Sequence, residues 1–143
     1  MAYLFDTDAI SEVLKPRPAP AYVQWLSAVA REDQLASAVS IGELFKGAYR
    51  SQASERHLKN IRERVLPAVT VLPFDTDVAP VFGEISAQLE GIGQRLADAD
   101  LQIAATALHH GLILVTGNLR HFERVTDLEL GRVLSETRDG ELP

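Results

Sequence analysis

The chain has 143 residues, of which 46% are apolar and 24% are charged, a composition typical of a globular domain and unlike that of a disordered or fibrous chain. It contains no cysteine, which excludes disulfides, thiolate catalysis and cysteine-ligated zinc. The net charge of −6 argues against tight nonspecific binding to nucleic acid, although a bound divalent cation would reverse the sign locally. The sequence shows no long apolar stretch and no basic segment followed by one at its start, so we expect a cytoplasmic protein without a membrane span.

Apolar runs and helical spacings alternate along the whole chain. They predict strands at 2–5, 35–39, 69–72 and 112–115, with a last edge strand at 128–134. Helices are expected at 10–14, 21–30, 41–49, 54–66, 76–90 and from about 99 to 110. We expect a loop or short turn at 119–123 and a loose end over the final nine residues. This order predicts an α/β fold in a single domain spanning 1–143, with a mostly parallel sheet of four to five strands flanked by helices.

Acidic side chains sit where these elements meet. Asp6 follows the first strand, Glu43 lies in the first turn of the helix after the second strand, and Asp98 and Asp100 begin the helix before the fourth strand. Asn118 follows the fourth strand, a position that alone would be typical of a turn. Because strand ends and the starts of neighbouring helices share one edge of a parallel sheet, we expect these side chains to meet there.

Such a cluster of carboxylates needs a neutralising partner. Two carboxylates 4 Å apart repel by ~4 kcal/mol at an effective dielectric constant of 20. Oxygen ligands suit Mg²⁺ or Mn²⁺, and a cation held in this way activates water and stabilises a phosphodiester under attack.

Each acid also has a structural explanation. Glu43 completes a capping box with Ser40, and Asp8 is a candidate cap for the first helix. Asp98 is placed to cap the helix that starts at residue 99, which leaves Asp100 as the better ligand and Asp98 as either cap or supplementary metal contact.

The four histidines do not indicate a zinc site. His109 and His110 end a helix before Gly111, and His57 and His121 are isolated in the sequence. No pair has the i, i+4 spacing of a helical zinc site.

Four motifs occur in a fixed order: LFDTDAIS at the N-terminus, SIGEL in the middle, DLQIAAT, and LILVTGN. Together with LPFD after the third strand and RHFERV near the end, they resemble the PIN-domain ribonucleases, specifically the VapC-type toxins of bacterial toxin–antitoxin pairs. The resemblance covers essentially the whole chain.

The resemblance implies roles for particular residues. Asp6, Glu43 and Asp100 match the three metal-binding acids of the family, which hold Mg²⁺ or Mn²⁺ for hydrolysis of RNA. Asn118 stands where many members have a fourth acid, and Thr116 matches a hydroxyl residue that lines the site.

Asp8 stands where asparagine is more usual in the family, so this chain carries an extra peripheral carboxylate. Asp98 matches no fixed family role.

The resemblance also implies partners. Family members are inhibited by a cognate VapB-like antitoxin whose tail crosses the toxin's helices, commonly form homodimers, and reach operator DNA only through the antitoxin complex. Here the antitoxin groove is expected between helix 54–66 and the preceding helix with its apolar residues Leu44, Phe45, Ala48 and Tyr49. RNA phosphates are candidate ligands of the nearby basic residues, although acids interleave with them: Arg50, Arg56, Lys59, Arg62 and Arg64.

Two other functions compete with the ribonuclease hypothesis. LFDTDAIS also fits the nucleophile motif of haloacid-dehalogenase-like phosphatases, but the later motifs stand in the wrong order for that class. The non-enzymatic alternative is a catalytically inactive PIN module that uses the acidic crevice only to capture an antitoxin or another basic peptide.

Overall fold

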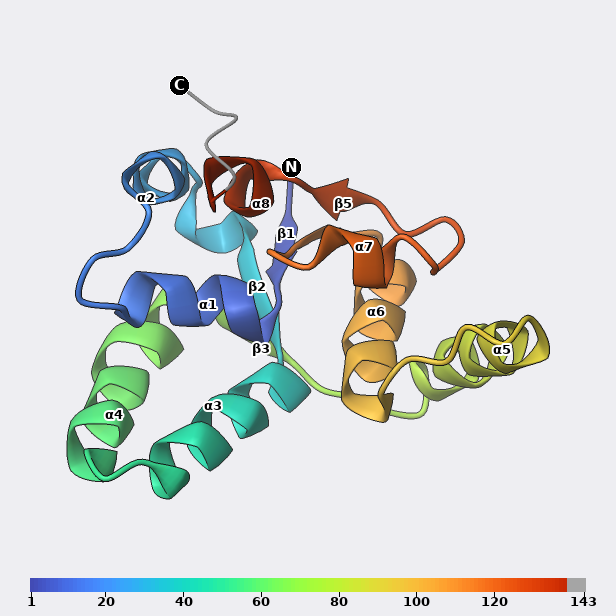
Figure 1. Cartoon of the computed structure of the whole chain (residues 1–143), viewed down its shortest axis with the longest axis horizontal. Helices are drawn as coiled ribbons and strands as arrows, with labels where there is room; N and C mark the ends of the chain where they lie inside the picture. Colours follow the sequence, from blue (N-terminus) through green and yellow to red (C-terminus); the bar gives the residue numbers. More distant parts are fainter. Residues whose placement is uncertain (139–143) are drawn as a thin grey trace.

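A five-stranded parallel sheet forms the centre of the computed structural model, which describes residues 1–138 (Figure 1). The strands are β1 (Tyr3–Phe5), β2 (Gln34–Ser37), β3 (Thr70–Leu72), β4 (Ile113–Val115) and β5 (Leu130–Gly131). Their order is β3-β2-β1-β4-β5, and every neighbouring pair is parallel. The predicted α/β fold with a parallel sheet is confirmed.

Within the described residues, eight α-helices connect and cover the strands. They are α1 (Thr7–Leu14), α2 (Pro20–Ser27), α3 (Ala38–Arg50), α4 (Ser54–Asn60), α5 (Ala79–Gly91), α6 (Asp98–His110), α7 (Leu119–Phe122) and α8 (Val133–Arg138). A 3₁₀ turn precedes β2 (Arg31–Asp33), and α4 continues into a π-helical turn (Ile61–Val65) and a 3₁₀ turn (Leu66–Ala68). Within residues 1–138, no helix is both long enough and apolar enough to cross a bilayer.

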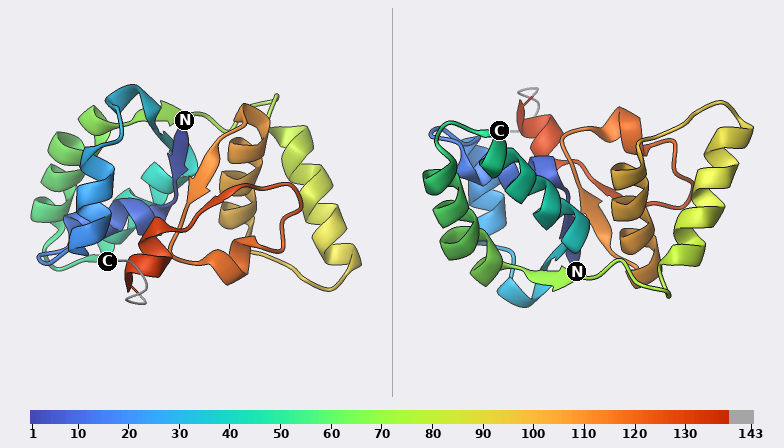
Figure 2. Two further views of the ribbon diagram at one scale, coloured as in Figure 1. Left: turned by 90° about the horizontal axis from the view of Figure 1, so that it is seen from above. Right: turned by 90° about the horizontal axis from the view of Figure 1, so that it is seen from below.

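The sheet divides the core into two halves because successive strand side chains face opposite sides. Leu4 and Leu114 pack with α5 and α6, whereas Phe5 and Val115 pack with α1, α2, α3 and α8. Figure 2 shows α5 and α6 on one side of the sheet and α1, α2 and α4 on the other. The central strands β1 and β4 are therefore covered on both faces, as expected of a parallel sheet, whereas the edge strand β3 is more exposed.

The strand register brings three chain segments to one edge. Phe5 pairs with Ala36 of β2 and with Val115 of β4. Asp6, Ser37 and Thr116 each follow one of these paired residues. All three therefore lie at the carboxyl edge of the sheet. Helix α6 precedes β4 and packs antiparallel to it, so its first turn returns to the same edge.

Several predicted boundaries are wrong. The expected strand at 128–134 is reduced to the two residues of β5, because the chain turns into α8 at Val133. The helix expected from about residue 76 begins at Ala79, whereas the loop or short turn expected at 119–123 is the single-turn helix α7. The last nine residues were expected to be loose, yet residues 135–138 are helical, while 139–143 lie outside the described residues.

Candidate functional site

Asp6 occupies the junction between β1 and α1. Its backbone amide donates to the carbonyl of Val115 at 3.1 Å, and its Oδ1 accepts from the amide of Ala9 at 2.8 Å. Asp6 is thus the N-cap of α1, and the predicted cap, Asp8, lies instead in the first turn. The helix begins earlier than its apolar pattern suggests because Asp6 already satisfies its free amides.

The Asp6 carboxyl is buried, with 5% of the residue exposed. Burial, the largest cause, and the nearby carboxylates of Asp8 and Asp100 together raise its pKa to about 7. Hydrogen bonds from the Thr116 hydroxyl and the Ala9 amide lower the pKa but do not outweigh burial. A cation beside Asp6 would favour its ionised form.

Glu43 lies in the second turn of α3. Ser37, not Ser40, caps this helix, because the Ser37 hydroxyl accepts from the amide of Val39 at 3.1 Å. The predicted capping box of Ser40 and Glu43 is therefore wrong, and the buried Ser40 hydroxyl has no hydrogen-bond partner within residues 1–138. Glu43 instead accepts a hydrogen bond from the hydroxyl of Thr7, with Oγ1 and Oε1 2.5 Å apart.

Asp98 and Asp100 both lie in the first turn of α6, but only Asp100 reaches the edge where β1 ends. The N-cap is Ala97, which provides no side-chain hydrogen bond, so the prediction that Asp98 caps the helix is wrong. Asp98 lines a separate hollow between α5 and α6. Asp100 accepts a hydrogen bond from Nε2 of His121 at 2.8 Å.

The segment after β4 adds neutral polar groups. The hydroxyl of Thr116 accepts from the amide of Asn118 at 2.9 Å, and Asn118 is the N-cap of α7. Gly117 lies directly beneath the side chains of Asp8 and Arg138, so a Cβ at this position would collide with both. A larger residue here would require the ends of these two side chains to move.

Arg138 connects the end of α8 to α1. Its guanidinium donates to Asp8 at 2.7 and 3.0 Å and to Glu12 at 2.6 and 3.1 Å. Glu12 is buried, and burial alone would raise its pKa. Hydrogen bonds from Arg138, the Ala19 amide and Lys15 outweigh burial and lower the pKa to about 2. Asp8 is thereby held in an ion pair at the rim of the acidic cluster.

These side chains surround one pocket of about 210 Å³. It is lined by Asp6, Thr7, Asp8, Glu43, Asp100, Ile103, Asn118 and Phe122. Asp6, Glu43 and Asp100 thus come from the β1–α1 junction, α3 and α6, and Asn118 joins them from the β4–α7 junction. Thr116 lies beneath the pocket, fully buried beside Asp6.

The donors of this pocket fit a hard divalent cation that keeps some of its water. Within residues 1–138, no three acidic or histidine side chains are already grouped closely enough to hold an ion. Each carboxylate has a hydrogen-bond donor of its own, because Glu43 accepts from Thr7 and Asp100 from His121. Mg²⁺ and Mn²⁺ are bound through few carboxylates and several waters, so an all-oxygen pocket of this size is chemically suited to them.

A second hollow of about 360 Å³ lies between α1, α3 and α4 and borders the first. Thr7 and Glu43 line both hollows, and the mainly apolar floor includes Leu44, Ala48 and Ile61. It lies between the helices around 44–49 and 54–66, where the resemblance implied a groove, and α1 forms a third wall. Tyr49 is exposed and does not line this hollow, and the ring of Phe45 lies under the Arg62 guanidinium.

Three contact residues were missed at the sequence level. The sequence indicates Thr7 as a neighbour of the site, because it directly follows Asp6. It also indicates His121, which lies one helical turn after Asn118. Nothing in the sequence indicates Arg138, because its contact with Asp8 spans 130 residues.

Comparison with known proteins agrees with this geometry. The family model of the PIN domain matches residues 3–128. The chain belongs to the PIN-domain family. Membership argues against the dehalogenase-like phosphatase alternative.

The chain is similar in sequence to two curated relatives and in structure to one solved complex. A Haemophilus influenzae protein named ribonuclease VapC2 is 37% identical over 133 residues, covering 90% of this chain and 95% of that protein. A Shigella flexneri protein named tRNA(fMet)-specific endonuclease VapC is 34% identical. The match covers 90% of this chain and 95% of that protein. The DNA-bound VapBC structure from Salmonella typhimurium superimposes with a TM-score of 0.84 at 30% identity, covering 92% of this chain and 97% of that one.

Proposed function

We propose that this PIN domain is a metal-dependent endoribonuclease, the toxin of a toxin–antitoxin pair, which hydrolyses RNA phosphodiester bonds and is inhibited by a cognate antitoxin. The observation that carries the proposal is the pocket that gathers Asp6, Glu43 and Asp100 from three distant segments beside Asn118. Relatives of nearly full length named as ribonucleases support the reaction type.

Asp6 and Asp100 are the proposed direct ligands of Mg²⁺ or Mn²⁺, and Glu43 binds the cation or orients the attacking water. When bound, the cation supplies an activated water and stabilises the charge that develops on the phosphate. Asp98 is left out of the ligand set because it lines a different hollow. Asn118 carries no charge, which favours one firmly held cation over two.

The neutral groups around the acids position the substrate and water in this proposal. The Thr116 hydroxyl supports Asp6 and accepts from the backbone amide of Asn118, whose side-chain amide lines the pocket and is offered to a water or a phosphate oxygen. The Ala9 amide and the start of α1 hold the Asp6 carboxylate at the edge of β1. These contacts fix Asp6 before any ligand arrives, which reduces the reorganisation needed for catalysis.

The groove between α1, α3 and α4 is the proposed seat of the antitoxin. The solved neighbour from Salmonella typhimurium is a VapBC assembly bound to DNA, which supports an antitoxin partner and contact with operator DNA through it. Because Thr7 and Glu43 line both the groove and the acidic pocket, a chain lying in the groove would end at the proposed active site.

The purified chain, free of antitoxin, is expected to cleave RNA in Mg²⁺ or Mn²⁺ and to stop cleaving when EDTA removes the metal. The substrate panel should include tRNAs and unstructured RNAs, with fragments resolved on denaturing gels. Asp100→Asn should abolish cleavage without changing the circular dichroism spectrum, whereas Asp98→Asn should retain cleavage. Absence of cleavage by folded protein on every RNA would favour the binding-only PIN module.

Thr7→Val is expected to lower cleavage about 10-fold, because it removes the hydroxyl that holds Glu43 while keeping the shape of the side chain. The measurement is kcat and KM on one RNA substrate, with the effect expected mainly in kcat. Ser11→Ala is the matched control, since the Ser11 hydroxyl donates to the backbone carbonyl of Thr7 and not to an acid. Equal activity in Thr7→Val and wild type would show that the Thr7–Glu43 bond does not matter for the reaction.

A further inference from the structure

His121 contacts the proposed metal ligand Asp100 directly. The His121 Nε2 and the Asp100 Oδ2 are 2.8 Å apart, and the two side chains are 26% and 31% exposed. Because an ionised carboxylate only accepts hydrogen bonds, the hydrogen lies on Nε2 of His121.

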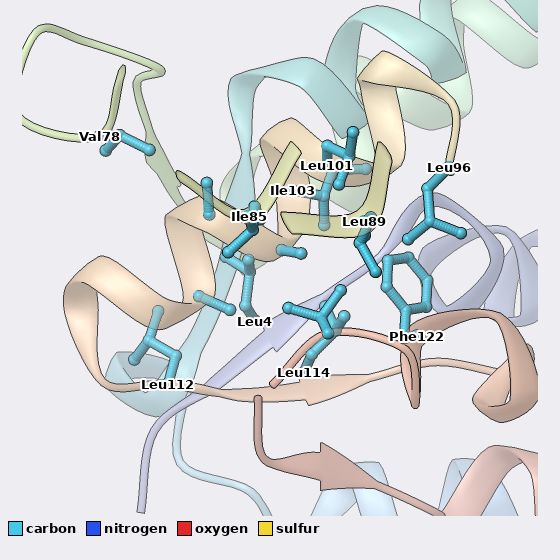
Figure 3. Packing of buried hydrophobic residues seen from close by; sticks show 14 residues of the cluster. Leu4, Val78, Ile85, Leu89, Leu96, Leu101, Ile103, Leu112, Leu114 and Phe122 are labelled. Carbon is cyan, nitrogen blue, oxygen red and sulfur yellow. The ribbon is translucent and has the colours of Figure 1, made fainter. Parts of the chain in front are cut away.

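The position of His121 is fixed by the residue that follows it. Phe122 is buried, and Figure 3 shows its ring inside the core cluster beside Leu96 and Leu114. The rings of His121 and Phe122 meet edge to face, with centroids 5.5 Å apart. The Phe122 amide also donates to the Asn118 carbonyl at 3.4 Å, closing the single turn of α7. The imidazole is therefore presented to α6 from a turn that is anchored in the core.

Asp100 depends on this contact for its orientation. Helix α6 has no side-chain cap, and within residues 1–138 the Asp100 carboxylate has no hydrogen-bond partner other than His121. Asp6, in contrast, is held by Ala9 and Thr116, and Glu43 is held by Thr7. Each of the three acids thus has its own donor.

We propose that His121 is a positioning residue that engages Oδ2 of Asp100 and thereby directs Oδ1 toward the cation in the acidic pocket. The inference rests on the proposed function, because it assigns a role toward the metal site proposed above. Hydrogen bonds from neighbouring residues commonly orient metal ligands in this way, and their loss weakens metal affinity about 10- to 100-fold. Because Nε2 carries the hydrogen that is donated to Asp100, this nitrogen has no lone pair to offer the cation.

The test measures Mn²⁺ binding directly, by the loss of the electron paramagnetic resonance signal of free Mn²⁺ on titration with folded protein. His121→Leu, which has no donor, should weaken Mn²⁺ affinity about 10- to 100-fold. His121→Gln places an amide N–H near the position of Nε2 and should keep the affinity within about 3-fold of wild type. His110→Gln, at the exposed end of α6, is the control and should bind as wild type does.

A second readout separates a positioning role from ligation. Electron spin echo spectra of Mn²⁺ bound to the wild-type chain should lack the nitrogen coupling of a bound imidazole. Such a coupling, if lost in His121→Gln, would make His121 a ligand and overturn the proposal. Unchanged affinity in His121→Leu would overturn it as well, while wild-type cleavage and Mn²⁺ binding would still support the metal-dependent ribonuclease. A wild-type chain that neither binds Mn²⁺ nor cleaves RNA would reject both proposals.

Discussion

Asp6→Asn is expected to abolish RNA cleavage and, at the same time, to stabilise the metal-free chain at pH 8. The activity should fall at least about 100-fold, because the substitution removes a negative ligand at the cation while keeping the shape of the side chain. Asparagine still accepts the hydrogen bond from the Ala9 amide, so the cap of α1 survives.

The stability gain follows from the buried carboxyl. Burial raises the pKa of Asp6 from 3.8 in the unfolded chain to about 7 in the folded chain. The folded state therefore binds the proton more tightly, and the free energy of unfolding falls as the pH rises from about 4 to about 7. A shift of this size corresponds to at most about 4 kcal/mol at pH 8, a penalty that asparagine does not incur.

Urea denaturation with EDTA at pH 4 and at pH 8 measures this difference. Wild type and Asp6→Asn should unfold at similar urea concentrations at pH 4, and Asp6→Asn should be the more stable at pH 8. Mg²⁺ should stabilise the wild type at pH 8 and have little effect on Asp6→Asn. Asp77→Asn, at an exposed position, should show neither effect. An Asp6→Asn variant that is equally or less stable at pH 8 would contradict the pKa argument.

The sequence predicted the acidic site better than it predicted the contacts that hold it. Asp6 and Asn118 could be placed because each follows a short apolar run, and parallel strands end at a common edge. The cap of α3 could not be assigned, since Ser37 and Ser40 both precede plausible first turns. The choice between them depends on where β2 stops pairing with its neighbours, which local sequence does not reveal.

The C-terminal helix was missed for a different reason. Residues 133–138 form a helix of six residues, too short to show a clear apolar period. Its stability comes from tertiary contacts: Leu134 is fully buried, and Arg138 reaches acids that lie 126 and 130 residues earlier. Propensity alone does not form such a helix, so only the assembled fold shows it.

Arg138→Ala is expected to destabilise the chain by about 2–4 kcal/mol, because it leaves the buried carboxylate of Glu12 without its main partner. The Glu12 side chain is only 4% exposed. After the substitution, its remaining hydrogen-bond donors are Lys15 and the Ala19 amide. The loss should be smaller than for a fully buried pair, since the guanidinium is 29% exposed. Arg138→Lys keeps the charge without the forked geometry and should have an intermediate effect.

The pH dependence identifies Glu12 as the cause. The pKa of Glu12 is lowered from 4.5 to about 2 in the folded chain, so its stabilising contribution is complete above about pH 4.5 and is lost as the pH falls toward 2. The stability difference between wild type and Arg138→Ala should therefore shrink over that range in urea titrations. In the Glu12→Gln background, Arg138→Ala should cost about 1 kcal/mol, since no buried charge is then left unpaired.

Arg132→Ala provides the matched comparison for Arg138→Ala. Arg132 forms an exposed ion pair with Glu123 at 3.3 Å, in which both side chains are at least half exposed. Its loss should cost no more than about 1 kcal/mol, as for other surface pairs. If Arg138→Ala were no more destabilising than Arg132→Ala, the ion pair of α8 with α1 would contribute little to folding. A larger loss in Arg138→Ala would show that this ion pair stabilises the fold. Because the same guanidinium bonds both Asp8 and Glu12, α8 would then also hold Asp8 at the rim of the acidic pocket.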